Sequence, residues 1–233
     1  RDCLLSRGLG DVYKRQLYAW WKTGGSTYYK QESTRRFRDT NAWYHFVFSI
    51  DTSQGTAADR IKIYVNGVQE TNFNSVTYPG LNEDLPVNNT NKQVVGANGY
   101  SSTANHWDGC LSHVAVVDGQ QLSPTSFGET DSTSGIWKFK SPSGVTFGTN
   151  GFHLKFENSG NLGLDSSGQT NNFTTNGNLK QALDTPSNVH ATINTLFAND
   201  NGDANALTDG SNTYTSTTRG EWNNMAMTLG AST

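Results

Sequence analysis

The amino-acid sequence predicts an all-β fold, a sandwich of short antiparallel strands, and three observations lead to this class. Apolar residues alternate with period two across residues 41–70, as they do in pleated strands. The 233 residues include 24 glycines and many Asn, Ser and Thr, which supply polar turns between short strands. Apolar positions nowhere recur at a helical spacing for long, so a helical bundle is excluded.

The strongest strand pattern is the one in residues 41–70. Its first half alternates large apolar residues with smaller or polar ones, at Tyr44, Phe46, Phe48 and Ile50. Its second half does the same at Ile61, Ile63 and Val65. The dipeptide Asn66-Gly67 follows, and both of its residues tolerate positive φ. We therefore predict a type I′ turn and a β-hairpin that returns through Val68–Glu70.

Further strands are expected in residues 17–22, 27–30, 93–97, 107–118 and 151–157. In residues 107–118 apolar side chains occupy both registers, which predicts burial of both faces of that strand. In residues 151–157 the alternation predicts that Phe152 and Leu154 face inward and that His153 faces outward.

Residues 1–16 are predicted to be foreign to the natural protein. Residues 6–16 resemble a translated sequencing-library adapter, because residues 11–16 back-translate to the transposon end used in tagmentation libraries. The segment has no strand or helix period, and we set it aside from the fold. Four of the 17 basic and two of the 20 acidic residues lie in it, so the remaining chain has a net charge of −5.

Charge and hydropathy exclude two classes of partner. A mildly acidic chain lacks the basic footprint that nucleic-acid binding needs. No apolar run approaches the roughly 20 residues of a membrane-spanning helix, so membrane insertion is not expected.

Several motifs together resemble laminin-G-like domains of the concanavalin A-like lectin/glucanase superfamily. They are W-x-H at Trp43 and His45, I-K-I-Y-V-N-G over residues 61–67, D-G-C-L-S-H-V-A-V-V-D-G-Q over residues 108–120 and L-S-P-T-S-F-G-E over residues 122–129. The continuations over residues 147–156 and 165–172 are similar to environmental phage and marine bacterial proteins in which a SPRY-like domain follows.

The resemblance implies a two-sheet antiparallel jelly roll that lacks its first strands. It divides the chain into the adapter-derived residues 1–16, a laminin-G-like sandwich over residues 17–183, and residues 184–233 as a linker and the start of a truncated SPRY-like domain. Glucanases of the superfamily carry catalytic carboxylates in an E-x-D-x-x-E arrangement on one strand. This sequence has no such spacing, so we expect a protein that is not an enzyme.

Two groups of residues are candidate sites. The loop at residues 98–108 offers aromatic faces and hydrogen-bonding groups for a sugar, from Asn98, Tyr100, Asn105, His106, Trp107 and Asp108. The alternative, which the sequence favours, is that Trp107 is a core residue at the start of its strand and that the loop is only solvated. The histidines in the predicted strands, His45, His113 and His153, are expected to be hydrogen-bonded strand residues rather than ligands or bases.

Asp165, Ser167 and Asn171 have a spacing somewhat like that of oxygen ligands in a calcium loop. One carboxylate among neutral groups holds calcium weakly. Laminin-G-like domains often bind this ion, so the resemblance implies calcium as a candidate cofactor at Asp165 and Asn171, and no cofactor as a requirement.

The expected function is a binding or structural module, a tail-fibre or host-adhesion component located on a virion or outside the cell. Its expected partners are a glycan or cell-surface ligand and other virion proteins. The alternative is an accessory or degenerate domain of a secreted polysaccharide-degrading enzyme.

Overall fold

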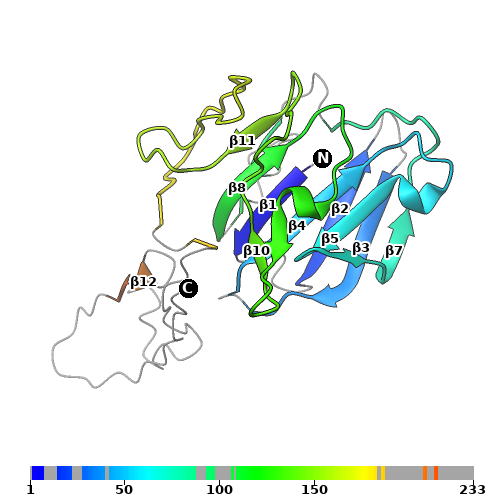
Figure 1. Cartoon of the computed structure of the whole chain (residues 1–233), viewed down its shortest axis with the longest axis horizontal. Coiled ribbons are helices and arrows are strands. Elements are labelled where there is room, and N and C mark those ends of the chain that lie inside the picture. Colours follow the sequence, from blue (N-terminus) through cyan, green and yellow to red (C-terminus); the bar gives the residue numbers. More distant parts are fainter. Residues whose placement is uncertain are drawn as a thin grey trace. The chain divides into compact units, whose positions relative to one another are not determined.

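A computed structural model describes residues 2–7, 15–22, 28–39, 42–87, 93–97, 106–107, 109–182, 185–186, 207–208 and 213–214, with residues 2–7, 22, 207–208 and 213–214 described by their backbone alone (Figure 1). The chain divides into two compact units, residues 1–179 and residues 180–233. The second unit contributes the short antiparallel pair β12 (Leu207–Thr208) and β13 (Thr213–Tyr214). Its prediction as a SPRY-like domain stays a prediction.

Unit 1 holds strands and two short turns of 3-10 helix, η1 (Ala57–Asp59) and η2 (Pro124–Ser126). Its strands are β1 (Asp2–Arg7), β2 (Gln16–Lys22), β3 (Tyr28–Arg36), β4 (Tyr44–Ile50), β5 (Ile61–Val65), β6 (Val68–Glu70), β7 (Phe73–Thr77), β8 (Cys110–Val116), β9 (Gly128–Thr130), β10 (Trp137–Phe139) and β11 (Phe152–Leu154).

Two antiparallel sheets pack face to face. The larger has the strand order β11-β8-β1-β4-β5-β6, and the smaller has the order β2-β3-β7 (Figure 1). Between them Leu17 and Ala19 of β2 cluster with Phe46 of β4 and with Ile63 and Val65 of β5. Burial of these apolar side chains is the main force that holds the two sheets together. The predicted all-β class with antiparallel sheets is confirmed.

The predicted hairpin at residues 61–70 is also confirmed. Val65 pairs with Val68 across a two-residue turn, in which Asn66 has φ 49° and Gly67 has φ 79°. Both φ angles are positive, as a type I′ turn requires, and the twist of such a turn matches the twist of the flanking strands. The side chain of Asn66 also accepts a hydrogen bond from the backbone N–H of His45 at 2.8 Å, which ties the turn to β4.

The segment that we set aside contributes a strand to this fold. β1 lies between β4 and β8 and pairs with both, with Leu4 opposite Phe46 and Ser6 opposite Leu111 (Figure 1). A strand in the middle of a sheet supplies the backbone donors and acceptors that its two neighbours need. The expectation that residues 1–16 lie outside the fold is therefore wrong for β1. Their adapter origin stays a prediction, because a strand can pair through its backbone whatever its side chains are.

A bulge at His113 interrupts the alternation predicted for β8. His113 has φ 52°, and the register against β1 shifts between Leu5 and Cys3. An extra residue of this kind moves the following side chains to the opposite face. Leu111 and Val114, three residues apart, consequently pack against the same apolar cluster. Both faces of β8 are buried, as predicted.

Residues 118–150, which we call the cover segment, lie over the face of the large sheet that points away from β2 and β3. Phe127 and Phe147 of the cover segment cluster with Val47 of β4 and Ala115 of β8. The Ser49 hydroxyl donates to the carbonyl of Leu122 at 3.2 Å. The large sheet is therefore buried on both faces, by the small sheet on one side and by the cover segment on the other.

Three histidines of the large sheet meet three aromatic rings of the cover segment. The ring pairs, with centroid separations, are His45–Trp137 at 5.8 Å, His113–Phe139 at 4.0 Å and His153–Phe147 at 5.8 Å. His113 Nδ1 and His153 Nε2 also share a hydrogen bond of 3.1 Å. The expectation of hydrogen-bonded strand histidines is confirmed, but the outward orientation predicted for His153 is wrong, because the cover segment buries it to 3% exposure.

These imidazoles are held neutral. Burial lowers the pKa of His45, His113 and His153 to about 4 in each case, because a low-dielectric environment disfavours the charged ring. The charge of Lys155 lowers the pKa of His113 and His153 further. The carboxylate of Glu157 raises the pKa of His113, and that of Asp165 raises the pKa of His153. Desolvation outweighs both carboxylates.

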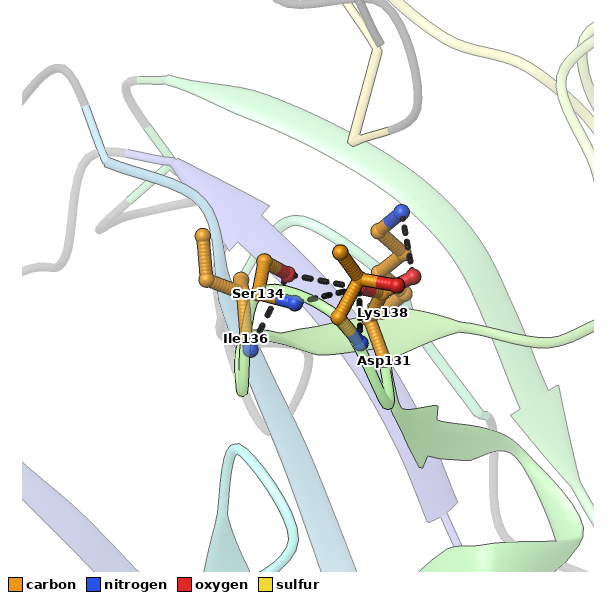
Figure 2. Close-up of polar contacts among 5 residues, drawn as sticks. Asp131, Ser134, Ile136 and Lys138 are labelled. Atoms are coloured by element: carbon orange, nitrogen blue, oxygen red, sulfur yellow. Dashed lines mark hydrogen bonds and ion pairs between the residues drawn. The ribbon is translucent and has the colours of Figure 1, made fainter.

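The turn between β9 and β10 is closed around one carboxylate (Figure 2). Asp131 Oδ1 accepts hydrogen bonds from the backbone N–H of Ser134 at 2.7 Å and from its hydroxyl at 2.8 Å. Lys138 Nζ lies 3.0 Å from Asp131 Oδ2. The hydrogen bond from the Ser134 backbone, followed by the one from Lys138, lowers the pKa of Asp131 below its usual range. The closed turn fixes the start of β10 and hence the position of Trp137.

Trp137 joins the cover segment to β4 and to the turn of the β5–β6 hairpin. Its Nε1 donates to His45 Nδ1 at 2.7 Å. Its indole ring lies so close to Gly67 and Gly128 that a Cβ atom at either glycine would collide with it. The slot exists because neither glycine has a side chain.

We predict that Gly128→Ala destabilises the protein by about 1–3 kcal/mol, because the added methyl overpacks the slot of Trp137. Urea unfolding followed by far-UV circular dichroism measures the loss. Gly55→Ala is the matched control, since a Cβ there meets no atom within 4 Å. Equal midpoints for Gly128→Ala and the unsubstituted chain would show that the slot is not tight.

We also predict that stability falls as the pH drops from about 6.5 towards 4. The folded histidines have a pKa of about 4 and the unfolded ones about 6.5, so the unfolded state binds more protons in this window. Above pH 6.5 the contribution of these three histidines to the free energy of unfolding is fully present. The lowered pKa values of Asp131 and Asp165 remove stability only at lower pH, as those carboxylates protonate.

Thermal melts between pH 7.5 and 5 measure this dependence. His45→Gln keeps an acceptor for Trp137 but cannot titrate in this range, so its melting temperature should vary less with pH. His106→Gln, at an exposed position, is the control and should reproduce the unsubstituted profile. A melting temperature that is constant from pH 7.5 to 5 would contradict the prediction.

Candidate functional site

The outer face of the small sheet carries three exposed aromatic side chains, which we call the aromatic face. Tyr18 and Trp20 of β2 are 52% and 44% exposed, and Tyr28 of β3 is 50% exposed. The rings of Trp20 and Tyr28 lie 5.8 Å apart between centroids, tilted by 42°. Large aromatic groups gathered on a solvated sheet face are unusual in a soluble domain and commonly mark a binding surface.

The local sequence explains why these rings face outward. Along β2 the buried residues Leu17 and Ala19 alternate with Tyr18 and Trp20. Because side chains of a strand alternate between faces, the residues that build the core force the two aromatic rings into solvent. The sequence analysis missed this site although β2 carries a signal for it. Tyr18 and Trp20 alternate with Leu17 and Ala19, so they face away from the core that Leu17 and Ala19 build.

Polar groups adjoin the aromatic face on the neighbouring strands. Trp20 is paired with Lys30 of β3, which is in turn paired with Thr77 of β7. Tyr18 is paired with Glu32 in the next row. Directly opposed residues of antiparallel strands have Cβ atoms about 5 Å apart, so ring faces and hydrogen-bonding groups lie side by side on this surface.

The loop predicted to bind a sugar is described only at His106 and Trp107; Asn98, Tyr100, Asn105 and Asp108 lie outside the described residues. His106 is exposed and bridges to Ala97, and the backbone N–H of Trp107 donates to Gly96 at 2.7 Å. Trp107 is half-buried and precedes β8 instead of opening it. A sugar site in this loop stays a prediction.

The residues predicted as calcium ligands form a closed hydrogen-bonded loop. Asp165 Oδ1 accepts from the backbone N–H groups of His153 and Ser167, both at 2.8 Å. Asp165 Oδ2 accepts from the Ser167 hydroxyl at 2.8 Å and from the Asn171 N–H at 2.9 Å. The Asn171 amide donates to the carbonyls of Thr149 and Gly151. Four donors already occupy the two carboxylate oxygens, an arrangement that favours a structural clamp.

The electrostatics of Asp165 agree with a clamp. Burial by itself raises the pKa of this carboxyl, but the hydrogen bonds from His153, Ser167 and Asn171 together outweigh burial and lower the pKa below its usual range. In the described ranges no three His, Cys, Asp or Glu side chains gather so as to hold a metal ion. In the same part of the chain, no helix is long and apolar enough to cross a membrane.

We predict that Asp165→Asn destabilises the protein by about 2 kcal/mol, because hydrogen bonds to a charged acceptor contribute about 1.5–3 kcal/mol. Asp59→Asn, which loses only the surface ion pair with Lys62, is the control and should cost less than about 1 kcal/mol. Excess Ca²⁺ or EDTA should leave the melting temperature of the unsubstituted chain unchanged. A Ca²⁺-dependent rise that disappears in Asp165→Asn would make the loop a calcium site after all.

Comparison with known proteins identifies the family. A laminin G model described as the concanavalin A-like lectin/glucanases superfamily matches residues 7–126, just over half of the 233-residue chain. The match includes the small sheet, with its aromatic face, and β4, β5, β6 and β8 of the large sheet. Neither the curated proteins nor the solved structures contain a match. The chain therefore belongs to the concanavalin A-like lectin/glucanase superfamily, whose members fold as jelly-roll sandwiches.

Proposed function

We propose that the chain is a carbohydrate-recognition module without catalytic activity. The observation that supports this proposal is the aromatic face of Tyr18, Trp20 and Tyr28, which presents three ring systems to solvent on one rigid sheet. The electron-rich face of an aromatic ring attracts the C–H groups of a sugar, and Trp and Tyr lose little conformational entropy when they bind.

The groups beside the rings suit the remaining chemistry of a sugar. Lys30 donates hydrogen bonds, Glu32 accepts them and the Thr77 hydroxyl does both. Lys30 and Glu32 are paired with Trp20 and Tyr18, and Thr77 is paired with Lys30 on the next strand, so these groups lie where sugar hydroxyls would be. An exposed sheet face offers a surface rather than an enclosed pocket, so it suits a polysaccharide chain better than a small ligand that needs enclosure.

We expect the chain to be slowed in native gels that contain a polysaccharide it recognises, from a panel of laminarin, agarose, κ-carrageenan, polygalacturonate and hydroxyethylcellulose. Trp20→Ala should weaken the affinity about tenfold, equivalent to about 1.4 kcal/mol, which is within the range of one aromatic contact. Ile136→Ala is the matched control, because Ile136 is 63% exposed on the β9–β10 turn (Figure 2), which belongs to the cover segment and not to the small sheet.

Tyr100→Ala tests the loop at residues 98–108 as the competing site. Loss of affinity in Tyr100→Ala with none in Trp20→Ala would move the binding site to that loop. Binding to no polysaccharide of the panel would refute the proposed function. New reducing ends after incubation with laminarin would show catalysis and refute the non-enzymatic part of it.

The same proposal sets the protein on a virion or outside the cell, as a tail-fibre or adhesion component. Genes for capsid and tail proteins beside the coding sequence would support that setting. Genes for glycan utilisation would instead support an accessory domain of a secreted polysaccharide-degrading enzyme.

A further inference from the structure

Three arginines stand in solvent where β3 ends. Arg35, Arg36 and Arg38 are all exposed, whereas Phe37 between them is 5% exposed. Phe37 packs edge-on against Phe46 at 5.3 Å between ring centroids, and its backbone N–H donates to the Arg15 carbonyl at 2.7 Å. The backbone of this short run is therefore anchored in the core while its three guanidinium groups stay outside.

Among the residues that the structure describes, no ion pair involves the guanidinium group of Arg35, Arg36 or Arg38. In the described part of the chain, the ion pairs are made by lysines instead: Lys62, Lys138, Lys140 and Lys155. Arg35 lies over the Phe37 ring, with 5.6 Å from its guanidinium carbon to the ring centroid. Two carboxylates, Glu32 and Asp39, lie in the same stretch.

The local charge opposes the charge of the whole chain. Residues 30–39 carry four cationic and two anionic side chains, an excess of two positive charges, in a chain whose net charge is −3. Exposed like charges repel one another, and an uncompensated cluster creates a local positive potential that attracts anions. The cluster holds three of the eight arginines of the sequence within four positions.

Arg36 continues the register of the aromatic face along β3, Arg38 follows just beyond the strand, and Arg35 lies over the ring of the buried Phe37. β3 carries Tyr28 at its start and Arg36 at its end, and Gln16 and Tyr18 of β2 are paired with Arg36 and Glu32. At about 3.3 Å per residue, four residues of strand separate the row of Tyr18 from the row of Arg36 by roughly 13 Å. One extended polymer can therefore contact rings and guanidinium groups together.

We infer that the ligand is an anionic polysaccharide, carrying sulfate or carboxylate groups, whose sugar rings stack on the aromatic face while its acidic groups bind Arg35, Arg36 and Arg38. This inference rests on the proposed function. The planar guanidinium fork matches a carboxylate or a tetrahedral oxyanion with two parallel hydrogen bonds. The acidic remainder of the chain disfavours nucleic acid, whose high charge density needs a broader basic surface.

Two matched pairs of polymers test the inference on the full chain. κ-Carrageenan and agarose are sulfated and neutral galactans, and polygalacturonate and its methyl ester differ only in free carboxylates. We expect at least tenfold tighter binding to the charged member of a pair. The preference should shrink as NaCl is raised from 50 to 500 mM, because salt screens exposed charges.

The triple variant Arg35→Gln, Arg36→Gln, Arg38→Gln should lose this preference while it keeps its binding to the neutral member. The charge-matched control is Lys62→Gln, Lys140→Gln, Lys155→Gln, which removes three positive charges elsewhere and should keep the preference. Replacing the three arginines with lysine should leave an intermediate preference, because charge remains and the planar fork is lost.

Failures of the two proposals are distinguishable. Binding to no polymer would overturn the proposed function and the inference together. Equal binding of charged and neutral polymers, lost in Trp20→Ala, would overturn only the anionic ligand. A preference that persists in the arginine variant would also overturn it. Binding of a thymidine oligonucleotide as tight as that of κ-carrageenan, and lost in the arginine variant, would assign the cluster to nucleic acid instead.

Discussion

Burial of both faces of the large sheet is the constraint on which this structure depends. The small sheet covers one face with apolar contacts, and the cover segment closes the other over three imidazoles. Neutral imidazole is well suited to this position, because it can stack on an aromatic ring and exchange a hydrogen bond at its edge. The bond between Trp137 and His45 joins residues 92 positions apart, beside the Asn66-Gly67 turn of the β5–β6 hairpin.

This arrangement decides which surface is left for recognition. Among the described residues, β4, β5 and β8 of the large sheet carry buried side chains that are covered by other segments, which leaves little of those strands for a ligand to contact. The small sheet has one covered face and one exposed face, and its exposed face carries Tyr18, Trp20 and Tyr28. Rings held on neighbouring paired strands keep their spacing, so a flat sheet can present them with little loss of entropy on binding. The rigid sandwich thus supports the proposed binding surface directly.

The charged and apolar parts of the proposed site have different physical roles. Aromatic contacts depend on shape and vary little with salt, whereas the guanidinium groups act through charge and are screened as ionic strength rises. A polymer with both kinds of group gains from both interactions at once. Because Arg35 and Arg36 belong to β3 and the next residue, Phe37, is packed in the core, the arginines are held close to the strand that carries Tyr28.

The sequence alone determined the local elements, namely the hairpin with its Asn66-Gly67 turn, the double burial of β8 and the all-β class, because period-two alternation and turn chemistry are local properties. Tertiary structure decided the rest. Only the bulge at His113 shows which residues of β8 share a face, and only the cover segment turns His153 from a surface residue into a buried one. Four hydrogen-bond donors, from His153, Ser167 and Asn171, converge on the Asp165 carboxylate. Their spacing in the sequence alone cannot distinguish such a clamp from a metal site. Burial and the partners of a side chain depend on what folds over it, and that information lies in the three-dimensional arrangement rather than in local pattern.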